Sequence, residues 1–231
     1  MAKVIFIPWP MPQAQEFLDK SNQWNDALAH DGVAKRFTIV TYQPGTTDAT
    51  LDTMADGDVY LRGHGQPGSP FVTTHGANLH IRDSIARLIE MGLKPAFRGK
   101  IKFYSCYSGL DGVQKMRATM VTVPKVAIGP IKLGSKSVVR DVDKGIFEGS
   151  YASLASRGAA IFRGHGFTHC TYFGYPGPLS SQMEARTEET LADGHAHKHC
   201  LVVTFDPTGT AVSGSDAASV GRRASAARLQ F

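Results

Sequence analysis

Short apolar runs alternate along the first half of the chain with segments in which apolar residues recur at helical spacing. Four runs predict strands buried on both faces, and they span residues 3–8, 36–42, 58–61 and 100–105. Two periodic segments predict amphipathic helices, and they span residues 13–29 and 79–91. This alternation predicts an α/β fold in which helices flank an open, mostly parallel six-stranded sheet, a three-layer sandwich.

The second half of the chain has weaker patterns. Its predicted helices span residues 113–120 and 150–155, and its predicted strands span residues 125–128, 159–162 and 200–205. We interpret residues 1–212 as one domain in which residues 165–200 form a loop-rich extension. Residues 213–231 are rich in Ser, Ala and Gly and predict a flexible basic tail.

Composition narrows the class of protein. Hydrophobic residues make up 42% of the 231 residues and charged residues 19%, which excludes a disordered chain and indicates a buried core. The net charge of +5 includes Arg222, Arg223 and Arg228 near the end of the chain. We interpret them as part of a solvated tail, with no specific nucleic-acid partner.

The expected location also comes from composition. Three widely spaced cysteines are too few for a disulfide framework and fit a reducing compartment. The sequence predicts neither a signal peptide nor a membrane-spanning segment, so we expect no membrane partner. A cytoplasmic protein is the expectation, with signal-less export as the alternative.

Two chemically capable residues follow neighbouring predicted strands. His64 lies between Gly63 and Gly65, and Cys106 comes directly after the strand at residues 100–105. Functional residues gather at the carboxyl ends of parallel strands, so we expect both at one edge of the sheet. A nearby imidazole can take the proton of a thiol, which makes Cys106 a candidate nucleophile and His64 its general base. The backbone N–H groups of Gly65 and Cys106 are candidates for an oxyanion hole.

The sequences around these two residues also carry a family resemblance. His64 lies in the segment YLRGHG (residues 60–65), and Cys106 lies in the segment SCYSG (residues 105–109). The two residues are 42 positions apart. This pattern resembles the caspase-like cysteine peptidases, nearest to metacaspases and paracaspases, over roughly residues 3–131. The resemblance implies a caspase-like sheet, a His64–Cys106 dyad, and cleavage of peptide bonds in a protein or peptide substrate without a cofactor.

The chain departs from the family pattern beside the cysteine. Metacaspases carry an acidic residue two places before the nucleophile, where this chain has Tyr104, and often a histidine after it, where it has Tyr107. The resemblance therefore leaves open the residue preferred at the cleaved bond, and also calcium activation and self-cleavage. Tyr104, Asp111 and His165 are candidates for lining a substrate pocket. Asp111 can alternatively cap a helix, and His165, in a second Arg-Gly-His-Gly segment, can be a plain loop residue.

Two other functions stay open from the sequence. His195, His197 and His199 would project from one face of an extended segment, and imidazoles on one face can bind a metal ion. The alternative function is therefore a metal-binding protein or metallohydrolase that uses the C-terminal His/Cys cluster. The other alternative is a caspase-like domain that has lost catalysis and serves as a binding module.

Overall fold

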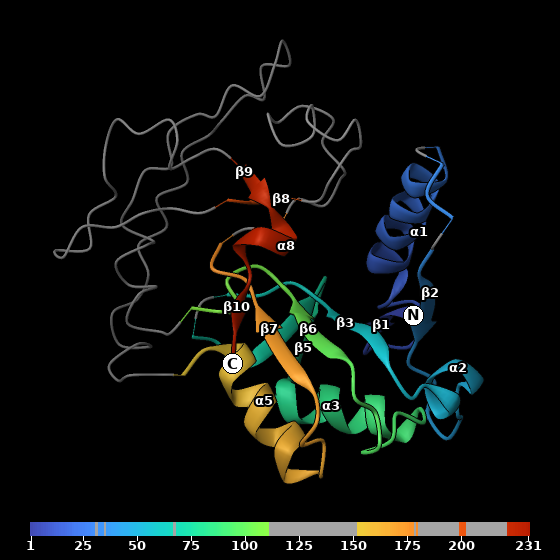
Figure 1. Ribbon diagram of the computed structural model, residues 1–231, viewed down its shortest axis with the longest axis vertical. Coiled ribbons are helices and arrows are strands. Elements are labelled where there is room, and N and C mark those ends of the chain that lie inside the picture. Colours follow the sequence, from blue (N-terminus) through green and yellow to red (C-terminus); the bar gives the residue numbers. More distant parts are fainter. Residues whose placement is uncertain are drawn as a thin grey trace, which may run out of the picture.

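One mixed sheet forms the centre of the protein. The computed structural model describes residues 1–30, 32–34, 36–66, 68–110, 152–177, 179, 199–201 and 221–231. Six strands are hydrogen-bonded in the order β10-β7-β6-β3-β1-β2, and β10 alone is antiparallel to its neighbour (Figure 1). Their bounds are β1 (Ala2–Ile7), β2 (Thr38–Thr41), β3 (Gly57–Arg62), β6 (Lys100–Tyr104), β7 (Thr171–Gly174) and β10 (Leu229–Gln230).

Helices cover both faces of this sheet. Helix α1 (Gln15–His30) packs on one face, where the ring of Trp24 stacks 5.4 Å from that of Tyr104. Helices α3 (Ile81–Glu90) and α5 (Leu154–Gly164) pack on the other face, where Phe162 lies 6.3 Å from Phe103. Phe103 and Tyr104 are successive residues of β6 and point to opposite faces, so the described elements form three layers (Figure 1).

Short elements connect and extend these layers. The segment after β3 forms an antiparallel hairpin of β4 (Phe71–Thr74) and β5 (Ala77–His80). Helix α2 (Ala49–Thr53) precedes β3 and is capped by the carboxylate of Asp48. Strand β8 (His199–Leu201) pairs with β9 (Gly221–Arg223), and helix α8 (Ala224–Ala227) leads from β9 to β10.

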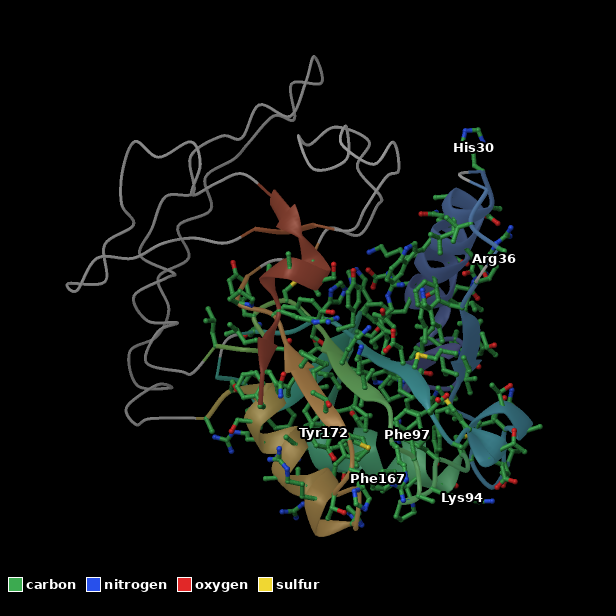
Figure 2. All side chains as sticks on the ribbon, viewed as in Figure 1. His30, Arg36, Lys94, Phe97, Phe167 and Tyr172 are labelled. Carbon is green, nitrogen blue, oxygen red and sulfur yellow. The ribbon has the colours of Figure 1, made fainter. Side chains whose placement is uncertain are left out.

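A packed aromatic cluster closes the amino-terminal edge of the sheet. Figure 2 shows the labelled Phe97, Phe167 and Tyr172 close together in the lower part of the molecule, whereas His30, Arg36 and Lys94 lie at the periphery. The hydroxyl of Tyr172 donates to the carbonyl of Phe167 at 2.6 Å, and all three aromatic side chains of the cluster are fully buried. The amino edge of β6 and β7 is thus closed by a packed aromatic cluster.

The predictions for the first 105 residues are largely confirmed. The predicted strands correspond to β1, β2, β3 and β6, and the predicted helices correspond to α1 and α3. The α/β fold with a mostly parallel six-stranded sheet flanked by helices is also confirmed. The hairpin of β4 and β5 and helix α2 are not among the predicted elements, and the second predicted helix begins at Ile81 rather than at residue 79.

Predictions for the second half need correction. Residues 159–162 were predicted as a strand but lie inside helix α5, because a four-residue apolar run cannot distinguish the two by periodicity. The helix begins after Ser153, whose side chain accepts from the Ser156 N–H. Residues 113–120 and 125–128 lie outside the described residues.

The predicted loose tail also needs correction. Residues 221–231 contain two strands and a helix, and β10 pairs with β7 through Leu229 opposite Gly174. Residues 229–230 therefore belong to the same sheet as β1. The domain extends at least to residue 230 instead of ending at residue 212.

The face of the sheet under α1 contains a buried charge. Lys102 is 3% exposed, and its Nζ donates to Asp58 Oδ2 at 2.8 Å and to the Tyr60 hydroxyl at 2.7 Å. Burial lowers the pKa of Lys102 to about 8, although the hydrogen bond and charge of Asp58 oppose that shift. An unfolded lysine keeps a pKa of about 10.4, so the unfolded chain binds more protons than the folded protein above pH 8.

The contribution of Lys102 to the stability of the protein should therefore rise with pH in this window. Between pH 8 and pH 10 we expect the free energy of unfolding of the wild type to gain on the order of 2 kcal/mol relative to Lys102→Met. Urea denaturation of both proteins at several pH values measures this difference. Parallel stability curves for the two proteins would contradict the prediction.

Candidate active site

The pairing of β3 with β6 brings His64 and Cys106 to one edge of the sheet. Arg62 and Tyr104 are opposite each other in the parallel register, and His64 and Cys106 each follow two positions later. Adjacent strands lie about 4.8 Å apart, so the two segments leave the sheet side by side. Gly65 lies directly against Cys106, since a Cβ on Gly65 would be 2.7 Å from the Cβ of Ser105 and 3.3 Å from the Cys106 nitrogen.

Three neighbours hold His64 in place. Its backbone N–H donates to the carbonyl of Thr73 at 2.8 Å, and the Thr73 N–H donates back to the His64 carbonyl at 3.0 Å. The imidazole packs against the ring of Phe17 at 4.9 Å, and its Nε2 lies 3.1 Å and 3.2 Å from the two carboxylate oxygens of Glu16. The His64 side chain keeps 46% of its exposure, so the ring is both oriented and accessible.

Glu16 contacts His64, although nothing in the sequence singles it out. Its carboxylate also pairs with Lys20 Nζ at 2.6 Å, one turn further along α1. Burial raises the pKa of Glu16, but the hydrogen bonds from Lys20 and His64 and their charges lower it by more, so the net shift is downward. Only the strand order could have pointed to Glu16. Because β1 lies beside β3, the start of α1 lies near the residues that follow β3.

The turn that carries Cys106 is anchored by the residues that follow it. The Ser108 hydroxyl donates to the carbonyl of Phe103 at 2.7 Å and accepts from the Tyr175 N–H at 3.0 Å, which joins the ends of β6 and β7. A Cβ on Gly109 would lie 3.1 Å from backbone atoms of Gly174 and Tyr175, so a larger residue at this position would push slightly against the end of β7. The serine and glycine of the Cys-x-Ser-Gly segment therefore set the geometry of the turn.

The surroundings of the Cys106 thiol favour its protonated form. Its Sγ accepts a hydrogen bond from the Leu179 N–H at 3.3 Å. Burial raises the pKa of the thiol, and the N–H groups of Leu179 and Cys106 and the charge of Lys20 lower it by less, so the net shift is upward. The thiol is thus protonated near neutral pH, and a nucleophilic attack requires that a neighbouring group take its proton.

The other candidate residues lie in different places. Tyr104 is 5% exposed and lies within an aromatic cluster, where its ring contacts Trp24 and Tyr175 at 5.4 Å and 5.3 Å. His165 follows the last residue of α5, near the amino edge of the sheet where β7 begins, and so lies away from Cys106. The second Arg-Gly-His-Gly segment therefore ends a helix rather than a strand.

The predicted metal ligands lie largely beyond the described part of the chain. Asp111, His195 and His197 are outside it, and His199 is described only as part of the backbone of β8. Among the described residues, no group of three or more His, Cys, Asp or Glu side chains could hold a metal ion. The metal-site hypothesis stays a prediction.

Comparisons with family models, with curated proteins and with solved structures found no match. Among the described residues, no helix is long and apolar enough to cross a membrane.

Close packing at Gly65 can be tested with a matched pair of glycines. We expect Gly65→Ala to lower the free energy of unfolding by about 1–3 kcal/mol and to slow alkylation of Cys106, because the added methyl group displaces the Cys106 backbone. Gly164→Ala in α5 is the control, since nothing lies within 4 Å of its added Cβ, and we expect no loss of stability. Urea denaturation and iodoacetamide kinetics measure both variants. Equal behaviour of the two would contradict the tight contact.

Proposed function

We propose that this protein is a cysteine peptidase of the caspase-like kind, with Cys106 as nucleophile and His64 as general base. The proposal rests on one observation. Arg62 and Tyr104 are opposite each other in the adjacent parallel strands β3 and β6, and His64 and Cys106 follow two positions later, with Gly65 packed against Cys106. The six-stranded, mostly parallel sheet flanked by helices supports the proposal, since the motif resemblance implies such a sheet.

The chemistry begins with the protonated thiol. As the sulfur of Cys106 attacks the carbonyl carbon of a peptide bond, His64 accepts the thiol proton. The resulting tetrahedral intermediate carries a negative oxygen, and the N–H groups of Gly65 and Cys106 are the proposed donors to it. The C–N bond then breaks, and the leaving amine takes the proton from His64.

Water completes the reaction. The acyl group remains on Cys106 as a thioester. A water molecule then attacks the carbonyl carbon of this thioester, and His64 accepts a proton from the water. The C–S bond breaks, the carboxylic acid product leaves, and the proton returns from His64 to the sulfur. The cycle uses only these two side chains and two backbone N–H groups.

The substrate in this proposal is a protein or peptide. Tyr104 stands where metacaspases carry an acidic residue, and its ring is enclosed by other aromatic rings. A preference for Arg or Lys at the cleaved bond is therefore not part of the proposal.

Labelling and turnover test the two roles together. We expect Cys106→Ala to abolish both labelling by a thiol-reactive peptide probe and hydrolysis of a peptide library. We expect His64→Ala to lower hydrolysis by at least about 10²-fold, the usual loss of a general base. Mass spectrometry of the labelled peptide and profiling of the library measure these effects.

Cys170 supplies the control. Its thiol lies just before β7, donates to the carbonyl of Phe97 at 3.2 Å, and has a pKa raised by burial to about 11. We expect Cys170→Ala to keep both labelling and turnover. Unchanged hydrolysis in Cys106→Ala would overturn the proposed function, and bound zinc in stoichiometric amount, lost in His197→Ala, would favour the metal-site alternative.

A further inference from the structure

The carboxylate of Glu16 engages His64 through one ring nitrogen only. Both of its oxygens lie within hydrogen-bond distance of Nε2, at 3.1 Å and 3.2 Å. A carboxylate accepts hydrogen bonds and does not donate them, so this contact fits the tautomer in which Nε2 carries the proton. The other nitrogen, Nδ1, is then free of a proton and can act as a base.

The surroundings of Glu16 keep it fixed and ionised. Glu16 lies in the first turn of α1, where a negative charge is favourable, and Lys20 pairs with it one turn later. The next residue, Phe17, is 3% exposed and packs between the rings of Trp9, at 5.8 Å, and His64, at 4.9 Å. The helix that carries the carboxylate is therefore packed directly against the imidazole that it contacts.

The charges near this pair are unevenly balanced. Glu16 and Lys20 come from α1, and Arg62 comes from β3, where its guanidinium donates to the Ser21 hydroxyl at 2.7 Å. Lys20 pairs with Glu16, and the Arg62 guanidinium lies 5.9 Å from the centre of the Phe17 ring, so two cations adjoin residues that contact His64. Glu16 supplies the negative charge that contacts the imidazole directly.

We propose that Glu16 is a positioning residue that extends the dyad to a Cys106–His64–Glu16 arrangement. It accepts the Nε2–H hydrogen bond and so presents Nδ1 to the thiol. When the thiol proton moves to Nδ1, the carboxylate stabilises the imidazolium and takes no proton itself. This inference rests on the proposed function, because it assigns a role within that site.

Alkylation of Cys106 by iodoacetamide tests this role without any peptide substrate. In the full chain, we expect Glu16→Ala to slow alkylation at least about tenfold near neutral pH, because the ring loses both its orientation and its counter-charge. Glu16→Gln keeps an oxygen that can accept from Nε2, so we expect it to recover part of the rate. In both variants the pH of half-maximal alkylation should move downward, since loss of the negative charge beside the site favours release of a proton from both the imidazolium and the thiol.

A matched control lies on the same helix. Asp19→Asn removes one negative charge from an exposed carboxylate whose partner is Gln15, and we expect the wild-type rate and pH profile. Thermal unfolding of all variants checks that each is folded, and Glu16→Gln, which keeps the size of the side chain, carries the test if Glu16→Ala does not fold.

The result separates the two proposals. Wild-type rates and pH profiles in Glu16→Gln and Glu16→Ala, together with slow alkylation in His64→Ala, would overturn the role of Glu16 and leave the dyad intact. Wild-type alkylation in His64→Ala would overturn the proposed function itself. A slower rate and a shifted pH profile in the Glu16 variants, but not in Asp19→Asn, supports the three-residue arrangement.

Discussion

The parallel hydrogen bonding between β3 and β6 determines where His64 and Cys106 lie. The register places Arg62 opposite Tyr104, so the chain segments that follow carry His64 and Cys106 away from the same point of the sheet. A shift of one residue would reverse the faces to which the side chains of one strand point. The same pairing directs Phe103 toward α5 and Lys102 toward Asp58, so core and site depend on one register.

The two edges of the sheet are held by different kinds of contact. At the amino edge, Phe97, Phe167 and Tyr172 are fully buried, and this packing is typical of a structural core. At the carboxyl edge, the loop residues are held by specific polar contacts instead, such as those of Ser108 with the ends of β6 and β7. A site at this edge can be rigid because the hydrogen bonds that define it start from strands that the core already fixes.

The environment of the thiol explains why a partner residue matters. Burial raises the pKa of the Cys106 thiol, so the free thiolate is a minor species near neutral pH. In the proposed function the base that takes this proton must be oriented, and His64 is held by Thr73 through its backbone and by Phe17 and Glu16 through its ring. Helix α1 therefore contributes to the site as well as to the core, although it lies far from both motif segments in the sequence.

The sequence by itself determined four strands and two long helices of the first half, because buried strands and amphipathic helices have distinct hydrophobic patterns. It also singled out the two motif residues, since glycine-flanked His64 and Cys106 each follow a strand. It could not reveal Glu16, since a glutamate in a helical first turn looks like any solvated charge until β1 pairs with β3. Only the tertiary structure decided that residues 159–162 are helical, that His165 lies near the other edge, and that β10 completes the sheet. The apolar run at residues 159–162 is too short to distinguish strand from helix by itself. The places of His165 and β10 depend on contacts between residues far apart in the chain, and local patterns carry no record of such contacts.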